Sequence, residues 1–365
     1  MSKVLDNFLK YFLGILFIFS GLIKINDPIG TSIKLKEYFE VFANDFAPFF
    51  KIFIPYSLLL AVVVVVLEVV LGVALIIHYR MRLTSWLFLL LIAFFTFLTF
   101  YSAYYNKVTE CGCFGDAIPL TPWQSFSKDV VLSIFVILLF IRQKHFKPFM
   151  TVRNGDLIMV AAIVINLFIA IHAIKHLPYI DFRPYKVGNN IPALMSPSEP
   201  YRYKYIMEKD GEECEFTEYP TDTTYRYKDM IILNPEAQPK ITDYHIWTDD
   251  GEFTEESFTG DKLFIIFYDV TRASTRHMDE IVELVRALES DVEVWALTAS
   301  SDTEFEPFRH EYQLAVPYFY ADMTVLEAII RSNPGLWLMR DGTVKGKWHH
   351  NDVPEAQTIL DLLNE

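Results

Sequence analysis

The chain has 365 residues, of which 52% are hydrophobic and 16% aromatic, and its formal net charge at pH 7 is −14. Residues 1–156 carry 14 Lys and Arg against 10 Asp and Glu, whereas residues 157–365 carry 18 against 36. A mildly basic, apolar half joined to an acidic half indicates a membrane unit followed by a soluble domain. The acidic half has no Lys/Arg cluster, which argues against nucleic acid as a partner. Three cysteines are too few for a disulfide scaffold.

Five apolar stretches are long enough to cross a bilayer as helices. They are predicted at residues 8–25, 54–77, 83–105, 123–141 and 157–174. The first is followed by no small-residue cleavage motif, and Asn26-Asp27-Pro28 ends it, so we interpret it as a retained helix and not a signal peptide.

Basic residues in short loops predict the orientation of the spans. One basic turn joins the second and third stretches, and another joins the fourth and fifth; their residues are Arg80, Arg82, Arg142, Lys144, Lys147 and Arg153. We therefore expect a protein of the cell membrane with a cytoplasmic amino terminus. The carboxyl half would lie outside the cytoplasm, in the periplasm of a Gram-negative cell.

Cys111 and Cys113 lie in the loop after the third stretch, on the predicted outer face. A disulfide between them would close a small ring, and strain of that kind makes a disulfide more oxidising. The pair is therefore a candidate catalytic dithiol. A permanent structural disulfide, or small residues filling a tight loop, are the alternatives. A metal site is less consistent with the sequence, because two thiolates do not complete one and no nearby His supplies the rest.

Glu68 is the only charged residue in the second stretch. An ionisable group at that depth is costly and usually faces the bundle interior with a partner. Lys24 and Asp27, at the outer end of the first stretch, are the candidate partners. Glu68 would relay a proton or bind a quinone or substrate; an ion pair that only fixes helix packing is the alternative.

The carboxyl half divides into a linker with a small β-element at 181–240 and an α/β domain at 241–365. The linker is predicted to contain a hairpin around Asp210-Gly211. The domain is predicted to contain strands at 263–268, 292–297, 336–339 and 344–348, with helices at 277–290, 305–312 and 355–363. His349-His350 is interpreted as part of a solvated loop, and Cys214 as a residue without a role.

The domain at 241–365 resembles the thioredoxin fold of the TlpA or peroxiredoxin-like type. The resemblance is carried by the buried strand at 263–268, Asn333-Pro334 before a strand, and the following Asp341-Gly342 turn. It implies that Pro334 is cis and packs against the turn that holds the active site. That turn has no cysteine here; its candidate residues are Thr271, Arg272, Thr275 and His277. A thiolate is the nucleophile in disulfide exchange, so this domain is predicted to be non-catalytic.

Residues 8–145 resemble the MauE/DoxX family of four-helix membrane proteins. The resemblance is carried by Ser20-Gly21-Leu22-Ile23-Lys24, by Asn26-Asp27-Pro28, by Glu68 and by the Cys111-Gly112-Cys113 loop. It implies a four-helix unit at 1–145, followed by a fifth transmembrane helix at 146–180. Family members are linked to redox and respiratory processes. MauE proteins are linked to maturation of methylamine dehydrogenase beside a thioredoxin-like companion.

Two functional hypotheses follow. In the first, the protein is a membrane thiol–disulfide oxidoreductase that uses Cys111 and Cys113 and exchanges electrons with a quinone or an extracytoplasmic thiol protein. Its carboxyl domain would dock the partner without reacting. In the second, it is a non-enzymatic scaffold or assembly factor with a structural disulfide, and the carboxyl domain recruits a maturing redox protein.

Overall fold

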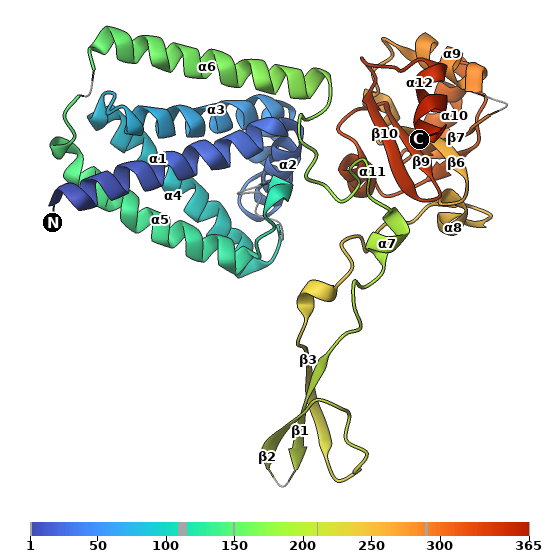
Figure 1. Cartoon of the computed structure of the whole chain (residues 1–365), viewed down its shortest axis with the longest axis horizontal. Helices are drawn as coiled ribbons and strands as arrows, with labels where there is room; N and C mark the ends of the chain where they lie inside the picture. Colours follow the sequence, from blue (N-terminus) through green and yellow to red (C-terminus); the bar gives the residue numbers. More distant parts are fainter. Residues whose placement is uncertain (1, 109–114, 149, 210, 289–290, 365) are drawn as a thin grey trace. The chain divides into compact units, whose positions relative to one another are not determined.

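The computed structural model describes residues 2–108, 115–148, 150–209, 211–288 and 291–364 (Figure 1). They form two compact units, Met1–Phe182 and Arg183–Glu365. The first unit is a helical bundle, and the second combines β-sheets with short helices.

The bundle contains the five long apolar helices that the sequence predicts. Its helices are α1 (Ser2–Asn26), α2 (Pro28–Asp45), the 3-10 helix η1 (Pro48–Tyr56), α3 (Ser57–Ile76), α4 (Met81–Tyr105), α5 (Pro122–Arg142) and α6 (Val152–Lys175). The candidate spans are Val4–Asn26, Pro48–Ile76, Met81–Tyr105, Pro122–His145 and Val152–Lys175. The protein is therefore a multi-pass membrane protein, and the predicted spans are confirmed as helices.

Small residues let α1 and α3 approach closely. A Cβ atom at Gly72 of α3 would lie 2.7 Å from the carbonyl oxygen of Gly14 in α1. A Cβ atom at Gly21 of α1 would lie 2.4 Å from Cγ2 of Val69. Because a backbone oxygen cannot move aside as a side chain can, the Gly14–Gly72 contact requires glycine. Close packing at small residues is a common way for helices to associate in membranes.

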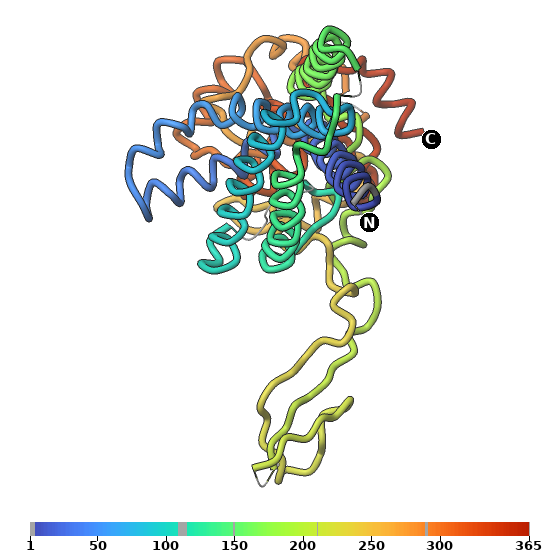
Figure 2. The backbone as a smooth tube through the Cα atoms, turned by 90° about the vertical axis from the view of Figure 1, so that its left-hand side faces the viewer, coloured from blue at the N-terminus to red at the C-terminus, as the bar shows by residue number. Residues whose placement is uncertain are grey.

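The chain between α1 and α3 is also helical, although only residues 54–56 of it fall within a predicted span. Asp27 is the N-cap of α2 and Pro28 follows it at the first position, a combination typical of a helix start. Figure 2 shows α2 and η1 running out from the bundle and back to α3. α2 lacks the long apolar run by which the five spans are recognised, whereas η1 forms the first part of the candidate span Pro48–Ile76.

In the second unit, a seven-stranded mixed sheet has the order β10-β9-β6-β7-β8-β4-β5. Strands β6 (Asp261–Phe267), β7 (Glu293–Thr298) and β8 (Tyr318–Tyr320) are parallel. Strand β9 (Gly335–Arg340) runs antiparallel to β6, and β10 (Thr343–His349) antiparallel to β9. The short strands β4 (Trp247–Thr248) and β5 (Gly251–Glu252) form a hairpin at the other edge.

Helices connect these strands and cover a buried apolar core. They are α8 (Thr254–Ser257), α9 (Met278–Leu288), α10 (Asp302–Glu311), α11 (Met323–Ile329) and α12 (Ala356–Asn364). In β6, every residue after Asp261 is buried, as expected for a central strand with both faces covered. The predicted strands and helices of this domain are present; the short elements β8, α8 and α11 were not predicted.

A separate three-stranded sheet has the order β2-β1-β3. Its strands are β1 (Tyr203–Lys209), β2 (Glu212–Phe216) and β3 (Arg226–Ile232), and the short helix α7 (Ile191–Met195) precedes them. The antiparallel pairing of β1 with β2 confirms the predicted hairpin, and Gly211 in its turn has φ +84°. The third strand was not predicted.

Candidate functional site

Lys24 of α1 and Glu68 of α3 form an ion pair inside the bundle. The Nζ atom of Lys24 lies 2.5 Å from Oε2 of Glu68, and the two side chains are only 7% and 4% exposed. The same Nζ atom lies 4.8 Å from the centre of the Phe95 ring on α4. Charged groups at this depth are rare in membrane helices, and pairing offsets part of the cost of removing them from water.

The glycine contacts between α1 and α3 position this pair. Gly72 is one helical turn after Glu68, and Gly21 is one turn before Lys24. Residues three or four apart lie on the same face of a helix, so the close approach at the glycines and the two charged side chains share one interface. The short distance between the backbones lets the carboxylate and the ammonium group meet directly.

Asp27, the other candidate partner of Glu68, has a different role. Its Oδ1 accepts a hydrogen bond of 2.9 Å from the backbone N–H of Gly30 and so caps α2. The next residue inward, Asn26, exchanges two side-chain hydrogen bonds with the backbone of Ile180, at 2.7 and 3.1 Å. These contacts fix the end of α1, where Lys24 lies, against α2 and the chain that follows α6.

Cys111 and Cys113 lie outside the described residues, but both ends of their loop are anchored on the bundle. Val108 is fully buried, and its carbonyl oxygen accepts a hydrogen bond from the hydroxyl of Ser102. On the other side of the loop, a Cβ atom at Gly115 would lie 3.6 Å from Cγ2 of Ile23. Ile23 directly precedes Lys24 in α1, so the described chain resumes after the two cysteines against α1, next in sequence to a member of the ion pair.

The second candidate site joins the turn at 269–277 to the start of β9. The Asn333-Pro334 bond is cis, which confirms that prediction. The side-chain amide of Asn333 donates to the carbonyl oxygen of Asp269 at 2.6 Å, and the N–H of Ser274 donates to the carbonyl oxygen of Asn333 at 2.8 Å. The segment before β9 is thus bonded to two points of the turn.

The predicted turn residues make mostly local contacts. The hydroxyl and N–H of Thr271 donate to Asp269, and the guanidinium of Arg272 lies 3.4 Å from the same carboxylate. His277 lies 2.9 Å from Glu280, and the carbonyl oxygen of Thr275 accepts a long hydrogen bond of 3.4 Å from Met278. These contacts stabilise the turn and the start of α9, and none of them brings a nucleophile into position.

His349 and His350 do not lie in a solvated loop, so that prediction was wrong. His349 is 3% exposed, and Ser332, 2% exposed, accepts a hydrogen bond of 3.0 Å from the backbone N–H of His350. Burial lowers the pKa of the His350 imidazole, and the nearby His277 and Arg276 lower it further. The pairing of β10 with β9 brings this histidine to the turn, and no local sequence signal indicates it.

Among the described residues, no group of three or more His, Cys, Asp or Glu side chains is arranged to hold a metal ion. Cys214 is a free cysteine among the described residues and lies partly buried on β2 opposite Met207.

Residues 2–142 match the family described as Methylamine utilisation protein MauE. The membrane domain of this protein is therefore similar to the MauE family, over less than half of the chain. The match begins at the start of α1 and ends with α5, so it includes Lys24, Glu68 and the Cys111–Cys113 loop but not α6. Residues 201–232, which contain the three-stranded sheet, match a second family, described as a domain of unknown function (DUF8463). No curated protein matches the chain.

Proposed function

We propose that the protein is a membrane thiol–disulfide redox protein in which Cys111 and Cys113 alternate between a dithiol and a disulfide. The observation that carries the proposal is that the end of their loop, at Gly115, lies against the helix that supplies Lys24 to a buried ion pair. Ile23, which contacts the returning chain at Gly115, directly precedes Lys24. An ionisable pair retained in a membrane span marks a candidate functional site.

The ion pair offers two properties that thiol chemistry needs. A nearby ammonium group lowers the pKa of a thiol, and the thiolate is the species that attacks a disulfide. The Glu68 carboxylate, which is paired with Lys24, is also a candidate acid–base group for the protons that accompany thiol oxidation. Oxidation of the two thiols releases two electrons and two protons, and we propose a lipid-soluble quinone as their acceptor. Reduction of the disulfide by an extracytoplasmic thiol protein completes the cycle.

We further propose that the α/β domain is a non-catalytic, thioredoxin-like docking domain. Support comes from the order of its central strands, from the turn that joins β6 to α9, and from the Asn333 segment bonded to that turn. The turn contains no cysteine, so the domain would bind a partner without exchanging a disulfide with it. Basic loop residues favour an orientation that places this domain outside the cytoplasm, on the side of the Cys111–Cys113 loop.

The second candidate function is a scaffold or assembly factor for a protein of methylamine metabolism. It is favoured by the family to which residues 2–142 match and by the loss of cysteine from the turn at 269–277. In that case Cys111 and Cys113 form a fixed disulfide, and the ion pair only holds α1 against α3.

A trapping experiment separates the two functions. Exchange passes through a mixed disulfide that the second thiol resolves. Replacing one cysteine, as in Cys113→Ser or Cys111→Ser, should therefore accumulate a covalent adduct with the partner, visible on a non-reducing gel. The scaffold function predicts no adduct from either single variant. The double variant serves as the control and should form none in either case.

A further inference from the structure

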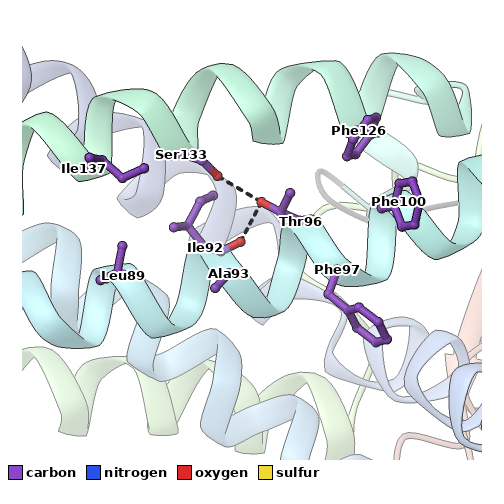
Figure 3. Close-up of a pocket in the computed structure, with 9 residues that line it drawn as sticks. All are labelled: Leu89, Ile92, Ala93, Thr96, Phe97, Phe100, Phe126, Ser133 and Ile137. Carbon is purple, nitrogen blue, oxygen red and sulfur yellow. Dashed lines mark hydrogen bonds between the residues drawn. The ribbon is translucent and has the colours of Figure 1, made fainter.

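A cavity of about 400 Å³ lies between α4 and α5, within the membrane-spanning part of the bundle (Figure 3). Its walls are apolar, and the rings of Phe100 and Phe126 meet at one end with centroids 5.5 Å apart. Only two polar side chains line it, Thr96 of α4 and Ser133 of α5, and Figure 3 shows their hydroxyls pointing toward each other. Because both helices are candidate spans, a ligand of this cavity must itself be soluble in the membrane.

The two hydroxyls differ in how their protons are used. Thr96 Oγ1 donates to the carbonyl oxygen of Ile92 at 2.7 Å, so its proton is committed to the helix. Ser133 Oγ lies 3.0 Å from Thr96 Oγ1 and can then only donate to it. That proton can instead turn toward a ligand, and the oxygen can accept from one. The Ser133 hydroxyl can thus donate a hydrogen bond to a carbonyl group of a ligand, or accept one from a hydroxyl group of the ligand at the same place.

A buried carboxyl group lies one helical turn from Ser133. Asp129 of α5 is 2% exposed; its Oδ2 accepts from Thr99 Oγ1 at 3.0 Å, and its Oδ1 lies 2.9 Å from Nζ of Lys128. Thr99 also lies 3.0 Å from the carbonyl oxygen of Phe95. If Asp129 gains a proton, the Thr99 hydroxyl can donate to Phe95 and accept from the carboxyl group. Both protonation states of Asp129 therefore keep a hydrogen-bond partner.

These side chains form a polar stripe along the α4–α5 interface. On α5, Ser125, Asp129 and Ser133 recur every four residues, and on α4, Thr96 and Thr99 are three apart. Ser125 is fully buried and its hydroxyl has no hydrogen-bond partner among the described residues. Ser125 is the member closest to the start of α5, which follows the loop of Cys111 and Cys113. The stripe thus runs from the loop end of the two helices to the cavity.

We propose that this cavity binds the ring of a lipid-soluble quinone, with Ser133 as its hydrogen-bonding group and Asp129 as the carboxyl group that handles its protons. A quinone ring would use the aromatic end, the Ser133 hydroxyl once its proton turns away from Thr96, and the nearby carboxyl group. A lipid acyl chain would use none of the polar groups. The inference rests on the proposed redox function of Cys111 and Cys113.

The reaction balances without a further reactant. The two thiols lose two protons and two electrons and form one S–S bond. The quinone gains both electrons and two protons, and its two carbonyl groups become hydroxyl groups. Asp129 does not line the cavity, so it would exchange protons with the ring through the stripe, whereas Ser133 would contact the ring oxygen directly.

Binding can be tested independently of thiol chemistry. The full-length protein in phosphatidylcholine nanodiscs is labelled with a photoactivatable azidoquinone, both as wild type and as the Cys111→Ser/Cys113→Ser variant, and labelled peptides are mapped. We expect label on α4 and α5 in both proteins, displaced by unlabelled quinone. Ala93→Trp, which fills the cavity, should abolish the labelling of α4 and α5. Leu90→Trp, at a 63% exposed position of the same helix, should leave the labelling unchanged. Ser133→Ala should weaken binding about five-fold, as expected for one neutral hydrogen bond.

The role of Asp129 has a separate readout. In a quinone-reduction assay with the cysteines present, Asp129→Asn should lower kcat about a hundred-fold and leave KM for the quinone within about two-fold, because general acid–base groups contribute on that scale. The assignment would be overturned if the label falls outside α4 and α5, or if either Ala93→Trp or excess quinone fails to reduce the labelling. Equal losses of kcat in Asp129→Asn and Leu90→Trp would also overturn it. Specific labelling of the Cys111→Ser/Cys113→Ser variant, with no quinone reduction by the wild type, would confirm the site and reject the redox function.

Discussion

The ammonium group of Lys24 and the carboxylate of Glu68 are 2.5 Å apart in a part of the bundle where both side chains are almost completely buried. Two glycines, each one helical turn from a member of the pair, bring the backbones of α1 and α3 together. Packing and charge pairing are thus linked at one interface between α1 and α3.

Removing one partner of this pair should destabilise the bundle strongly. Glu68→Gln leaves a buried ammonium group without a counter-charge, and the loss of one partner of a buried pair costs about 3–5 kcal/mol. Thermal aggregation of the detergent-solubilised protein should occur at a clearly lower temperature than for the wild type. The double variant Lys24→Met/Glu68→Leu should recover most of this loss, because no charge remains buried. If the double variant is stable but inactive, the pair has a functional role; full activity would limit it to packing.

The glycine contacts predict a second stability effect. Gly72→Ala places a methyl group 2.7 Å from the carbonyl oxygen of Gly14, so α1 and α3 must separate. We expect this change to reduce the amount of folded protein in membranes and to weaken the Lys24–Glu68 contact. Val63→Ala, which removes atoms from a 53% exposed position of the same helix, is the matched control. Equal membrane abundance of wild type and Gly72→Ala would contradict the close approach of the helices.

Cys214 provides a test of orientation with a native side chain. In the Cys111→Ser/Cys113→Ser variant it is the only cysteine of the chain. A membrane-impermeant maleimide added to intact spheroplasts should modify it, because the two basic turns predict that the carboxyl unit lies outside the cytoplasm. Brief detergent treatment serves as the control for a partly buried thiol. Modification only after the membrane is opened would reverse the proposed orientation.

The pKa of His350 predicts a pH dependence in the α/β domain. Burial lowers this pKa below the ordinary value of 6.5, so the folded domain favours the neutral imidazole. Its contribution to stability is therefore complete above about pH 6.5 and is lost as the pH falls below that value. Amide hydrogen exchange of β9 and β10, corrected for intrinsic rates, should accelerate between pH 7.5 and 5.5.

The substitution His350→Gln should remove most of that acceleration. His310→Gln is the control, because the His310 side chain is 79% exposed. An unchanged pH dependence in His350→Gln, or an equal loss in both variants, would assign the effect to other groups.

The sequence predicted the elements whose signals are local. Long apolar runs identify the five spans because each helix must satisfy its backbone within hydrocarbon. Glu68 was identified because it is the single charged residue in a valine-rich run. Lys24 was identified as a basic candidate partner at the end of the preceding span. The continuous apolar pattern of β6 and the amphipathic pattern of α9 were likewise sufficient to place these elements.

Other features depend on contacts between distant segments. α2 starts at a capping signal, Asp27-Pro28, and lacks the apolar run of a span, so hydropathy alone did not find it. β8 has three residues, too few for a periodic pattern. The burial of His349 arises only when β10 pairs with β9. The helical spacing of Thr96 and Thr99, and that of Asp129 and Ser133, was visible in the sequence. That these two pairs face each other became clear only from the packing of α4 on α5.

The redox state of Cys111 and Cys113 in native membranes tests the central claim most directly. Membranes are treated with a thiol-alkylating reagent before and after incubation with a mild reductant, and the mass added to the peptide that contains both cysteines is measured. The account predicts a mixed population that shifts to the dialkylated dithiol under mild reductant, and loss of activity without loss of membrane abundance in the Cys111→Ser/Cys113→Ser variant. A disulfide that resists the reductant, together with full activity of the double variant, would contradict it.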